Sequence, residues 1–149
     1  SDKEPLIEGV KAGPRGIKPN LHELQRLLNR ELHGETNIKR ALLEVSDKYS
    51  IEEVLLTMGR EGALALIGGS FYRIMVPEVS VKSAVGAGDS FLAAYCLSRE
   101  LGERSEVALK MAGAASSAAV MTPGTELCRF DDVMNLLPQI TVEAAIAPG

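Results

Sequence analysis

The chain has 149 residues, a length typical of one domain that can bury a substantial core. Hydrophobic residues make up 46% of it and charged residues 24%, which is ordinary for a soluble globular protein. A net charge of -4 argues against a nucleic-acid-binding surface, and no apolar run is long enough to span a membrane. Two scattered cysteines and no signal-peptide pattern exclude a disulfide framework and favour a reducing cytoplasm.

The first part of the chain predicts two helices and one brief strand. A short helix is expected over residues 4–12, followed by a strand at residues 17–18. Asn20 fits the N-cap of an amphipathic helix, with Glu23 three residues later as in a capping box. A further helix is expected over residues 36–49, where apolar residues recur at helical spacing.

The middle of the chain predicts strands. Residues 54–58 form a short apolar run that ends before a glycine, which is typical of a buried parallel strand. Residues 63–67 and 71–76 flank the turn at 68–70 and predict a hairpin. One more strand is expected over residues 79–84.

The last part of the chain predicts helices. Residues 89–101 are apolar nearly all round, which indicates a buried helix. A second helix over 105–121 is rich in small residues that suit close packing. Asp131 or Asp132 is expected to cap a last helix, and the tail after Pro138 is expected to fray.

Helices that alternate with short strands predict an α/β sheet covered by helices on both faces. Ligands of such sheets bind beyond the carboxyl ends of the strands. Three motifs fall at predicted strand ends, at residues 18–23, 57–62 and 85–89. Their positions predict one composite site.

The turn at residues 85–89 is the most informative of the three motifs. Gly86 and Gly88 lack a Cβ, so backbone N–H groups there can close on a phosphate at a helix start. Asp89 then stands beside the anion and can accept the proton of an attacking hydroxyl group. A P-loop and a dinucleotide fingerprint are excluded because their further residues are missing. A plain glycine turn with Asp89 as helix N-cap is the alternative.

The two histidines, His22 and His33, lie in a polar stretch and are expected at the surface. A catalytic triad with histidine or a zinc site is therefore not expected. Any metal should be a hard cation that is held by oxygen atoms and phosphates.

Four motifs follow one another in order along nearly the whole chain. They are Lys18-Pro19-Asn20, Thr57-Met58-Gly59-Arg60-Glu61-Gly62, Ser83-Ala84-Val85-Gly86-Ala87-Gly88-Asp89-Ser90-Phe91, and Thr122-Pro123-Gly124-Thr125 with Leu127-Cys128. Together they resemble the ribokinase-like (pfkB-type) carbohydrate kinases, in the phosphofructokinase branch. That branch includes the minor 6-phosphofructokinase, 1-phosphofructokinase and tagatose-6-phosphate kinase. The resemblance implies a ribokinase-like layered sheet with helices on both faces.

The resemblance also implies roles for individual residues. Asp89 would be the catalytic base, and the backbone of Gly86, Ala87 and Gly88 its anion hole. Glu23, in an Asn-x-x-Glu motif, would organise Mg²⁺. The residues implied to contact ATP are Lys18, Asn20, Thr57, Gly59, Gly62, Gly113 and Ser117.

A monovalent cation, K⁺, is implied next to the anion hole. The matching positions are Ser83, Val85, Ala119, Thr122 and Gly124. This sequence departs from the branch at two places. Ala84 stands where threonine is frequent, and Glu126 stands where the minor 6-phosphofructokinase has a basic residue.

Several of these residues also have a purely structural explanation. Lys18 could be an exposed lysine, and Glu23 could serve only the capping box. Residues 57–62 could be an ordinary turn, and Gly113 and Ser117 could be small residues for helix packing.

The resemblance implies ATP- and Mg²⁺-dependent phosphorylation of a ketohexose phosphate. The first expectation is fructose 6-phosphate, converted to fructose 1,6-bisphosphate in glycolysis. Fructose 1-phosphate, tagatose 6-phosphate and a plain sugar are alternative acceptors, and a non-catalytic nucleotide-binding or interaction module is the alternative outside enzymes. The complete enzyme is expected to be a homodimer that binds nucleotide and sugar phosphate, without nucleic acid or membrane.

The resemblance covers only the C-terminal half of the family. Nothing in residues 1–149 matches the Gly-Gly signature of the N-terminal half. We therefore expect these residues to be the nucleotide-binding portion, without the sugar-binding part and the lid, and nearly inactive alone.

Overall fold

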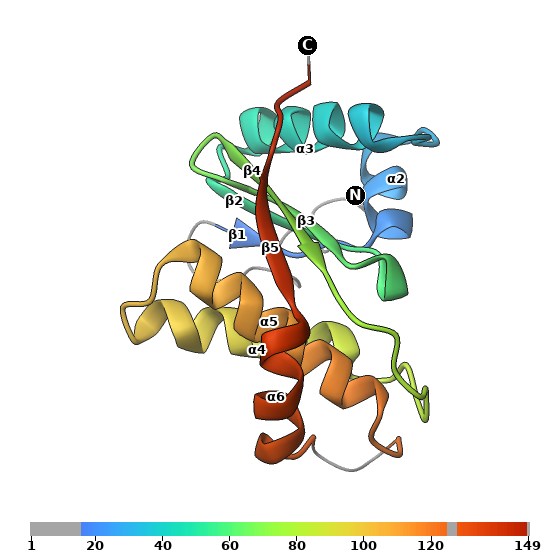
Figure 1. Ribbon diagram of the computed structural model, residues 1–149. Helices are drawn as coiled ribbons and strands as arrows, with labels where there is room; N and C mark the ends of the chain where they lie inside the picture. The colour runs from blue at the N-terminus through green and yellow to red at the C-terminus, as the bar shows by residue number, and fades with distance from the viewer. Residues whose placement is uncertain (1–15, 125–127, 149) are drawn as a thin grey trace. The chain divides into compact units, whose positions relative to one another are not determined.

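The computed structural model describes residues 16–124 and 128–148 (Figure 1). Helices are combined with a five-stranded sheet of order β1-β2-β3-β4-β5. The strands are β1 (Gly16–Ile17), β2 (Glu53–Thr57), β3 (Ala63–Ile67), β4 (Ser70–Met75) and β5 (Thr141–Ala145). The helices are α2 (Leu21–Leu28), α3 (Glu35–Tyr49), α4 (Ala87–Glu100), α5 (Ser105–Val120) and α6 (Phe130–Leu136), with short 3₁₀ helices η1 (Gly59–Glu61) and η2 (Leu137–Gln139).

The chain divides into two compact units. Among the described residues, the first unit comprises 16–58, 64–72 and 144–148. The second unit comprises 59–63, 73–124 and 128–143. The predicted helix over 4–12 lies outside the described residues.

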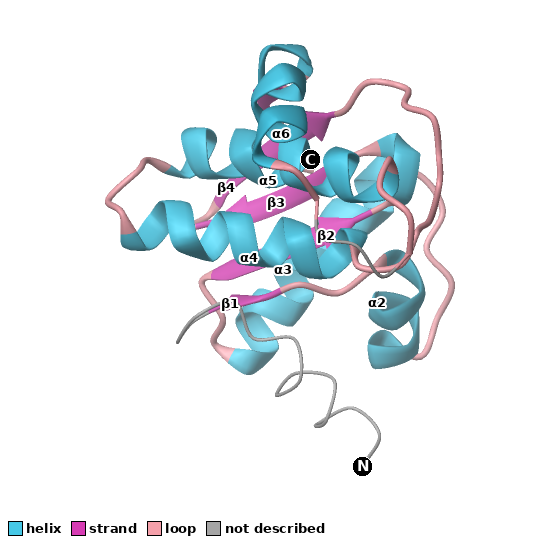
Figure 2. Ribbon diagram, turned by 90° about the horizontal axis from the view of Figure 1, so that it is seen from below, coloured by secondary structure: helices cyan, strands magenta, loops and turns pink. Residues whose placement is uncertain are grey.

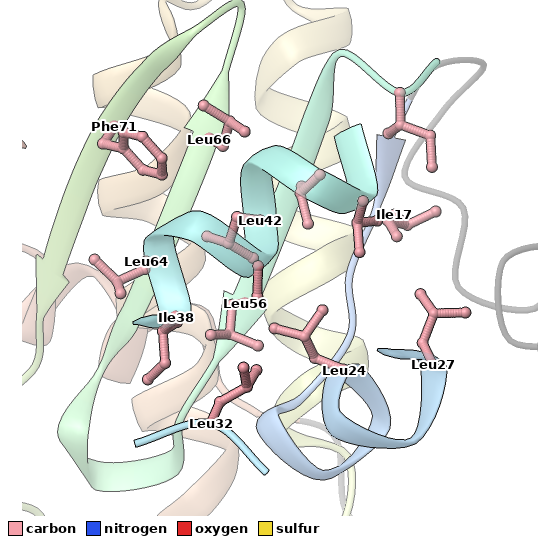
Figure 3. Close-up of a cluster of buried hydrophobic side chains, with 14 residues drawn as sticks. Ile17, Leu24, Leu27, Leu32, Ile38, Leu42, Leu56, Leu64, Leu66 and Phe71 are labelled. Atoms are coloured by element: carbon pink, nitrogen blue, oxygen red, sulfur yellow. The ribbon is translucent and has the colours of Figure 1, made fainter. Parts of the chain in front are cut away.

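The core of the first unit is an apolar cluster between two helices and the strands (Figure 3). Ile38 and Leu42 recur four residues apart on the inner face of α3, and Leu24 is fully buried on α2. They pack with buried residues of the strands, such as Leu56 and Leu64. Burying each such side chain contributes roughly 1.5–3 kcal/mol, so this helical spacing explains where both helices form.

The strands of the first unit follow the sequence prediction closely. β1 and β2 pair in parallel, with Ile17 opposite Val54. β3 and β4 form the predicted hairpin, and the two residues of its turn, Gly68 and Gly69, both have positive φ. A two-residue type I′ turn requires positive φ at both positions, which explains the two consecutive glycines.

The second unit is built on α4 and α5, which run side by side (Figures 1 and 2). Most residues of α5 are buried, and many of the buried residues are small, such as Ala112, Ala114 and Ala118. Small side chains let neighbouring elements approach closely, as the sequence predicted for 105–121. α5 also packs against α6 and η2.

The predictions for residues 79–84 and for the tail after Pro138 are both wrong. Residues 79–84 form no strand: the N–H groups of Lys82 and Ser83 donate to the carbonyl of Val120 at 2.8 and 3.2 Å. The end of α5 therefore takes the backbone bonds that a neighbouring strand would take. The tail after Pro138 does not fray, because β5 forms there and Arg73 of β4 pairs with Glu143 at 2.9 Å.

Two predictions about helices also need correction. The N-cap of α6 is Arg129, whereas Asp131 and Asp132 lie in its first turn. A negative charge there interacts favourably with the helix dipole. α4 is not buried all round: Phe91, Tyr95 and Ser98 are buried, whereas other apolar residues of this helix face outward.

Candidate active site

In the first unit, the structure brings together two of the predicted motifs. The N–H of Thr57, at the end of β2, donates to the carbonyl of Pro19 at 3.2 Å. Asn20 and Thr57 form an isolated parallel bridge just beyond the paired strands. Residues 18–20 and the end of β2 therefore lie side by side at the carboxyl ends of two parallel strands, as the sequence predicted.

Asn20 and Glu23 form the predicted capping box at the start of α2. The N–H of Glu23 donates to Asn20 Oδ1 at 2.8 Å, and the N–H of Asn20 donates to Glu23 Oε1 at 2.9 Å. This structural role is therefore confirmed. It uses one carboxylate oxygen of Glu23 and leaves Oε2 for a further ligand.

Lys18 is not an exposed lysine. Only 8% of this residue is accessible, directly after β1 and before the capping box. A lysine with its stem held in this way has fewer rotamers to lose when its ammonium group meets an anion. The alternative of an ordinary surface lysine is excluded.

In the second unit, the two glycines of the 57–62 motif differ in their surroundings. Both have positive φ, +59° at Gly59 and +89° at Gly62. A Cβ at Gly62 would lie 2.0 Å from the carbonyl oxygen of Ile74, whereas nothing lies within 4 Å of one at Gly59. Gly62 therefore has a structural role of its own, and Gly59 keeps the open backbone that a ligand could approach.

The predicted anion hole lies at the start of α4. Gly86 is the N-cap residue, with φ +84° and no side-chain capping bond, and its carbonyl accepts from Ser90 N–H at 2.8 Å. The N–H groups of Ala87, Gly88 and Asp89 belong to the first turn, which has no partners within the helix. Asp89 is exposed in this turn and is not the N-cap, so the ordinary N-cap alternative is wrong.

The residues predicted around K⁺ also lie in the second unit. Ser83 N–H is bonded to Val120 O, and a Cβ on Gly124 would lie 3.9 Å from Ser83 Oγ. Thr122 Oγ1 donates to the carbonyl of Ala118 at 2.8 Å, and the N–H of Val85 donates to Ser83 Oγ at 3.1 Å. The segment before α4 and the segment after α5 are thus neighbours.

The two small residues of α5 are buried, as their packing explanation requires. A Cβ on Gly113 would lie 3.0 Å from Ile140 Cγ2 and 3.2 Å from Ile74 Cγ2. Ser117 is 5% exposed, and its carbonyl accepts from Met121 N–H at 3.3 Å. A packing role for Gly113 is therefore confirmed, and contact of either residue with adenine stays a prediction.

Val120 is a residue that the sequence did not reveal. Its carbonyl accepts both bonds that fix residues 82–83. A backbone carbonyl acts in the same way whatever side chain it carries, so no sequence pattern marks it.

Both histidines lie at the surface: His22 is exposed, and His33 pairs with Glu31 at 3.3 Å between two exposed side chains. Within residues 16–124 and 128–148, no three His, Cys, Asp or Glu side chains are grouped as metal ligands. A search of the same residues finds no helix of the length and hydrophobicity that a membrane crossing requires.

Residues 3–132 match the sequence profile of the pfkB family carbohydrate kinases. With the five-stranded sheet, this match defines the class as a phosphotransferase family of the ribokinase-like fold. The chain belongs to the pfkB family of carbohydrate kinases.

Relatives with three different enzyme names match the chain. ATP-dependent 6-phosphofructokinase isozyme 2 of Escherichia coli K12 is 33% identical over 80% of this chain and 39% of its own length. The 1-phosphofructokinase of Vibrio cholerae is 34% identical over 97% and 45%. The tagatose-6-phosphate kinase of Staphylococcus epidermidis is 31% identical over 94% and 44%. The chain therefore spans less than half the length of each of these relatives.

Solved structures confirm the predicted fold class. Phosphofructokinase-2 of E. coli in complex with potassium has a TM-score of 0.79 and 30% identity, over 89% of this chain and 42% of its own. Arabidopsis thaliana ribokinase with ribose and ATP has a TM-score of 0.75 and 28% identity, over 83% and 40%. The ribokinase-like fold is thus present over part of those longer chains.

Proposed function

We propose that this chain is the nucleotide-binding portion of a kinase that transfers a phosphoryl group from ATP to a ketohexose phosphate. The observation that carries the proposal is the start of α4. There Gly86 leaves the first-turn N–H groups open, and Asp89 is exposed within the same turn. An anion site beside a carboxylate supplies the two functions that phosphoryl transfer to a hydroxyl group needs.

In this mechanism Asp89 accepts the proton of the acceptor hydroxyl through a carboxylate oxygen. The hydroxyl oxygen attacks the γ-phosphorus in line, and the bond from phosphorus to the bridging oxygen of ADP breaks. The N–H groups of Ala87, Gly88 and Asp89 stabilise the negative charge that spreads over the transferred group. In the first unit, Lys18 and Thr57 are proposed to contact the nucleotide.

Glu23 fits a magnesium ion that is held mainly by phosphates and water. Its Oε1 is engaged in the capping box, which fixes the carboxylate and leaves Oε2 for the ion or one of its waters. Mg²⁺ usually takes one or two carboxylates plus phosphate oxygens, so one glutamate suffices. When bound, the ion would neutralise charge on the phosphates.

A potassium ion fits the groups around Ser83. The segment before α4 and the segment after α5 are neighbours there: the N–H of Ser83 donates to the carbonyl of Val120, and a Cβ on Gly124 would lie 3.9 Å from Ser83 Oγ. We propose Ser83, Val85, Ala119, Thr122 and Gly124 as its ligand residues, and the potassium in the E. coli phosphofructokinase-2 structure supports this. Glu126 lies outside the described residues.

Fructose 6-phosphate is our first proposal for the acceptor because the E. coli 6-phosphofructokinase matches at 33% identity. Fructose 1-phosphate is a second candidate, since the V. cholerae enzyme matches at 34% over nearly the whole chain. A panel of fructose 6-phosphate, fructose 1-phosphate and tagatose 6-phosphate, assayed with a complete kinase that includes these residues, identifies the acceptor.

The first prediction tests Asp89. We expect Asp89→Asn to leave ATP affinity within about threefold by calorimetry, because the first-turn N–H groups remain. In a chimera where this chain replaces the matching region of the E. coli isozyme, the same change should lower kcat by about 10²–10⁴-fold. Asp131→Asn is the matched control, because Asp131 is an exposed first-turn carboxylate of α6.

Near-normal turnover of the Asp89→Asn chimera would refute the assignment of the base. Absence of ATP binding by the unaltered chain, with or without Mg²⁺, would instead refute the nucleotide site.

A further inference from the structure

Two glycines that are implied to contact ATP adjoin one buried residue of the second unit. This residue is Ile74, in β4, which is 0% exposed. Its carbonyl oxygen occupies the place where Gly62 would carry a Cβ, and its Cγ2 would lie 3.2 Å from a Cβ on Gly113. Gly62 directly precedes β3, and Gly113 belongs to α5. One residue of β4 therefore lies next to both.

The neighbourhood of Gly62 involves only backbone atoms of Ile74. The N–H of Gly62 donates to the carbonyl of Gly59 at 3.0 Å, which closes the turn over residues 59–62. Nothing lies within 4 Å of a Cβ on Gly59, so the anchored end of this turn is Gly62. The Ile74 carbonyl therefore limits where the turn can lie, whatever side chain residue 74 carries.

The neighbourhood of Gly113 involves side-chain atoms instead. Besides Ile74 Cγ2, the Cγ2 of Ile140 would lie 3.0 Å from a Cβ on Gly113. The bare backbone of α5 thus rests on two methyl groups, in an interior that is closely packed. The position of α5 at Gly113 therefore depends on which side-chain atoms residue 74 places there.

The two neighbourhoods are linked through a short and rigid path. Within Ile74, only Cα and Cβ join the carbonyl group to Cγ2. The strand fixes the backbone torsions, and a side chain that branches at Cβ has a stiff χ1 torsion. The separation between the turn at 59–62 and α5 at Gly113 is therefore set by a single rigid residue.

We infer that Ile74 is a positioning residue of the nucleotide site, which holds the turn at 59–62 and α5 at the separation that one ATP molecule spans. The inference rests on the proposed function and on the ATP contacts implied for Gly59, Gly62 and Gly113. Ile74 is fully buried, so it acts through these neighbours rather than by touching the nucleotide. When two places that bind one ligand change their separation, the ligand can no longer use both fully.

Two substitutions separate the position of Cγ2 from the volume that the side chain fills. Ile74→Val is smaller but keeps the methyl group on Cβ, whereas Ile74→Leu keeps the volume and has no methyl group on Cβ. Volume-conserving changes are tolerated best in a core, so a merely structural role makes Ile74→Leu the milder change. Positioning predicts the reverse order for ATP affinity.

The main measurement is calorimetry of ATP with Mg²⁺ on the full 149-residue chain. We expect Ile74→Leu to raise the Kd of ATP about tenfold and Ile74→Val to leave it within about twofold. Tripolyphosphate, which has no adenosine to reach α5, should bind both variants within about twofold of the unaltered chain. The loss is thus expected only for the ligand that spans both places.

Leu136→Ala is the matched control for stability. Leu136 is a buried residue of α6 in the same unit, and no residue implied to contact ATP belongs to α6. Because it leaves a cavity, this change should lower Tm at least as much as Ile74→Leu, in unfolding followed by circular dichroism. It should nevertheless leave the Kd of ATP within about twofold.

A folded Ile74→Leu chain that binds ATP within about twofold of the unaltered chain overturns the inference. Equal losses of ATP and tripolyphosphate affinity also overturn it, because they indicate damage to the turn rather than a changed separation. If Ile74→Leu does not fold, Gly113→Ala replaces it, since a methyl group there displaces α5 from Ile74. The same loss, for ATP only, is then expected, and unchanged ATP affinity overturns the inference.

ATP binding by the unaltered chain separates this inference from the proposed function. If the unaltered chain does not bind ATP, the proposed function fails and the inference fails with it. If the unaltered chain binds ATP and Ile74→Leu and Gly113→Ala bind it equally well, the inference alone is overturned.

Discussion

Gly62 is a position at which both the backbone conformation and the neighbouring atoms exclude a side chain. Its φ of +89° is strained for other residues, and the carbonyl oxygen of Ile74 occupies the place of a Cβ. Gly59 shares the left-handed conformation but has open space. Two glycines of one motif thus differ in what they do, although their sequence pattern treats them alike.

We predict that Gly62→Ala lowers the free energy of unfolding by about 3 kcal/mol, through left-handed strain and overpacking together. Gly59→Ala, the control, should cost about 1 kcal/mol, because only the backbone strain applies. Urea unfolding followed by circular dichroism measures both. Equal losses for the two variants would show that the contact with Ile74 has no energetic consequence.

At the scale of elements, the end of β5 is fixed by a buried lysine. Lys39 of α3 donates from Nζ to the carbonyl of Ile146 at 2.7 Å, and lies 3.3 Å from Glu35 and 6.0 Å from the centre of the Phe71 ring. Its side chain is 7% exposed. A charged donor in such a place holds the tail against the helix more firmly than a neutral one.

We predict that Lys39→Met releases the tail. The loss of one charge-assisted bond, about 1 kcal/mol, should speed amide hydrogen exchange in residues 142–147 about fivefold, with the rest of the first unit little changed. Lys48→Met is the control, since Lys48 is an exposed cation of the same helix over the Tyr49 ring. Unaltered exchange in the tail would mean that β5 alone holds it.

The helix α2 is an element whose structure can be predicted from its local sequence. Its N-cap, its capping box and its buried leucines follow from residues within one or two turns of each other. The strand β5 is the contrary case, because its partner β4 lies 70 residues away at the Arg73–Glu143 pair. Pairing at that separation leaves no signal in a local pattern.

At the scale of the whole molecule, the match over residues 3–132 establishes membership of the pfkB family. A relative named 6-phosphofructokinase and a relative named 1-phosphofructokinase match at nearly equal identity, 33% and 34%. The expected homodimer stays a prediction. The chain spans less than half the length of each of these relatives.

We predict that the chain alone binds ATP but phosphorylates fructose 6-phosphate at least about a thousandfold more slowly than the E. coli isozyme. If the chain is the nucleotide-binding portion, as proposed, it does not hold the hydroxyl group in line with the γ-phosphate, and positioning contributes much of the acceleration. An assay of ADP release for both proteins under the same conditions measures it. Turnover within tenfold of that isozyme would contradict the prediction.

The sequence by itself determined the fold class, the helix α2 with its cap, the β3–β4 hairpin and the glycine turn before α4. Each depends on residues that are close in the chain, where periodicity, capping and positive φ act directly. The same local chemistry identified Asp89 and its neighbouring N–H groups as the candidate site.

Only the tertiary structure decided what residues 79–84, the tail and the faces of α4 do. The Val120 carbonyl accepts the hydrogen bonds of residues 82–83, and the tail forms β5 because it lies beside β4 in the sheet. The helix α5 packs along α4, whereas Leu97 and Leu101 stay exposed. The physical reason is common to all three. Each outcome depends on which backbone or side-chain group, distant in the sequence, lies close enough in space to be a partner. A local sequence pattern does not identify that partner.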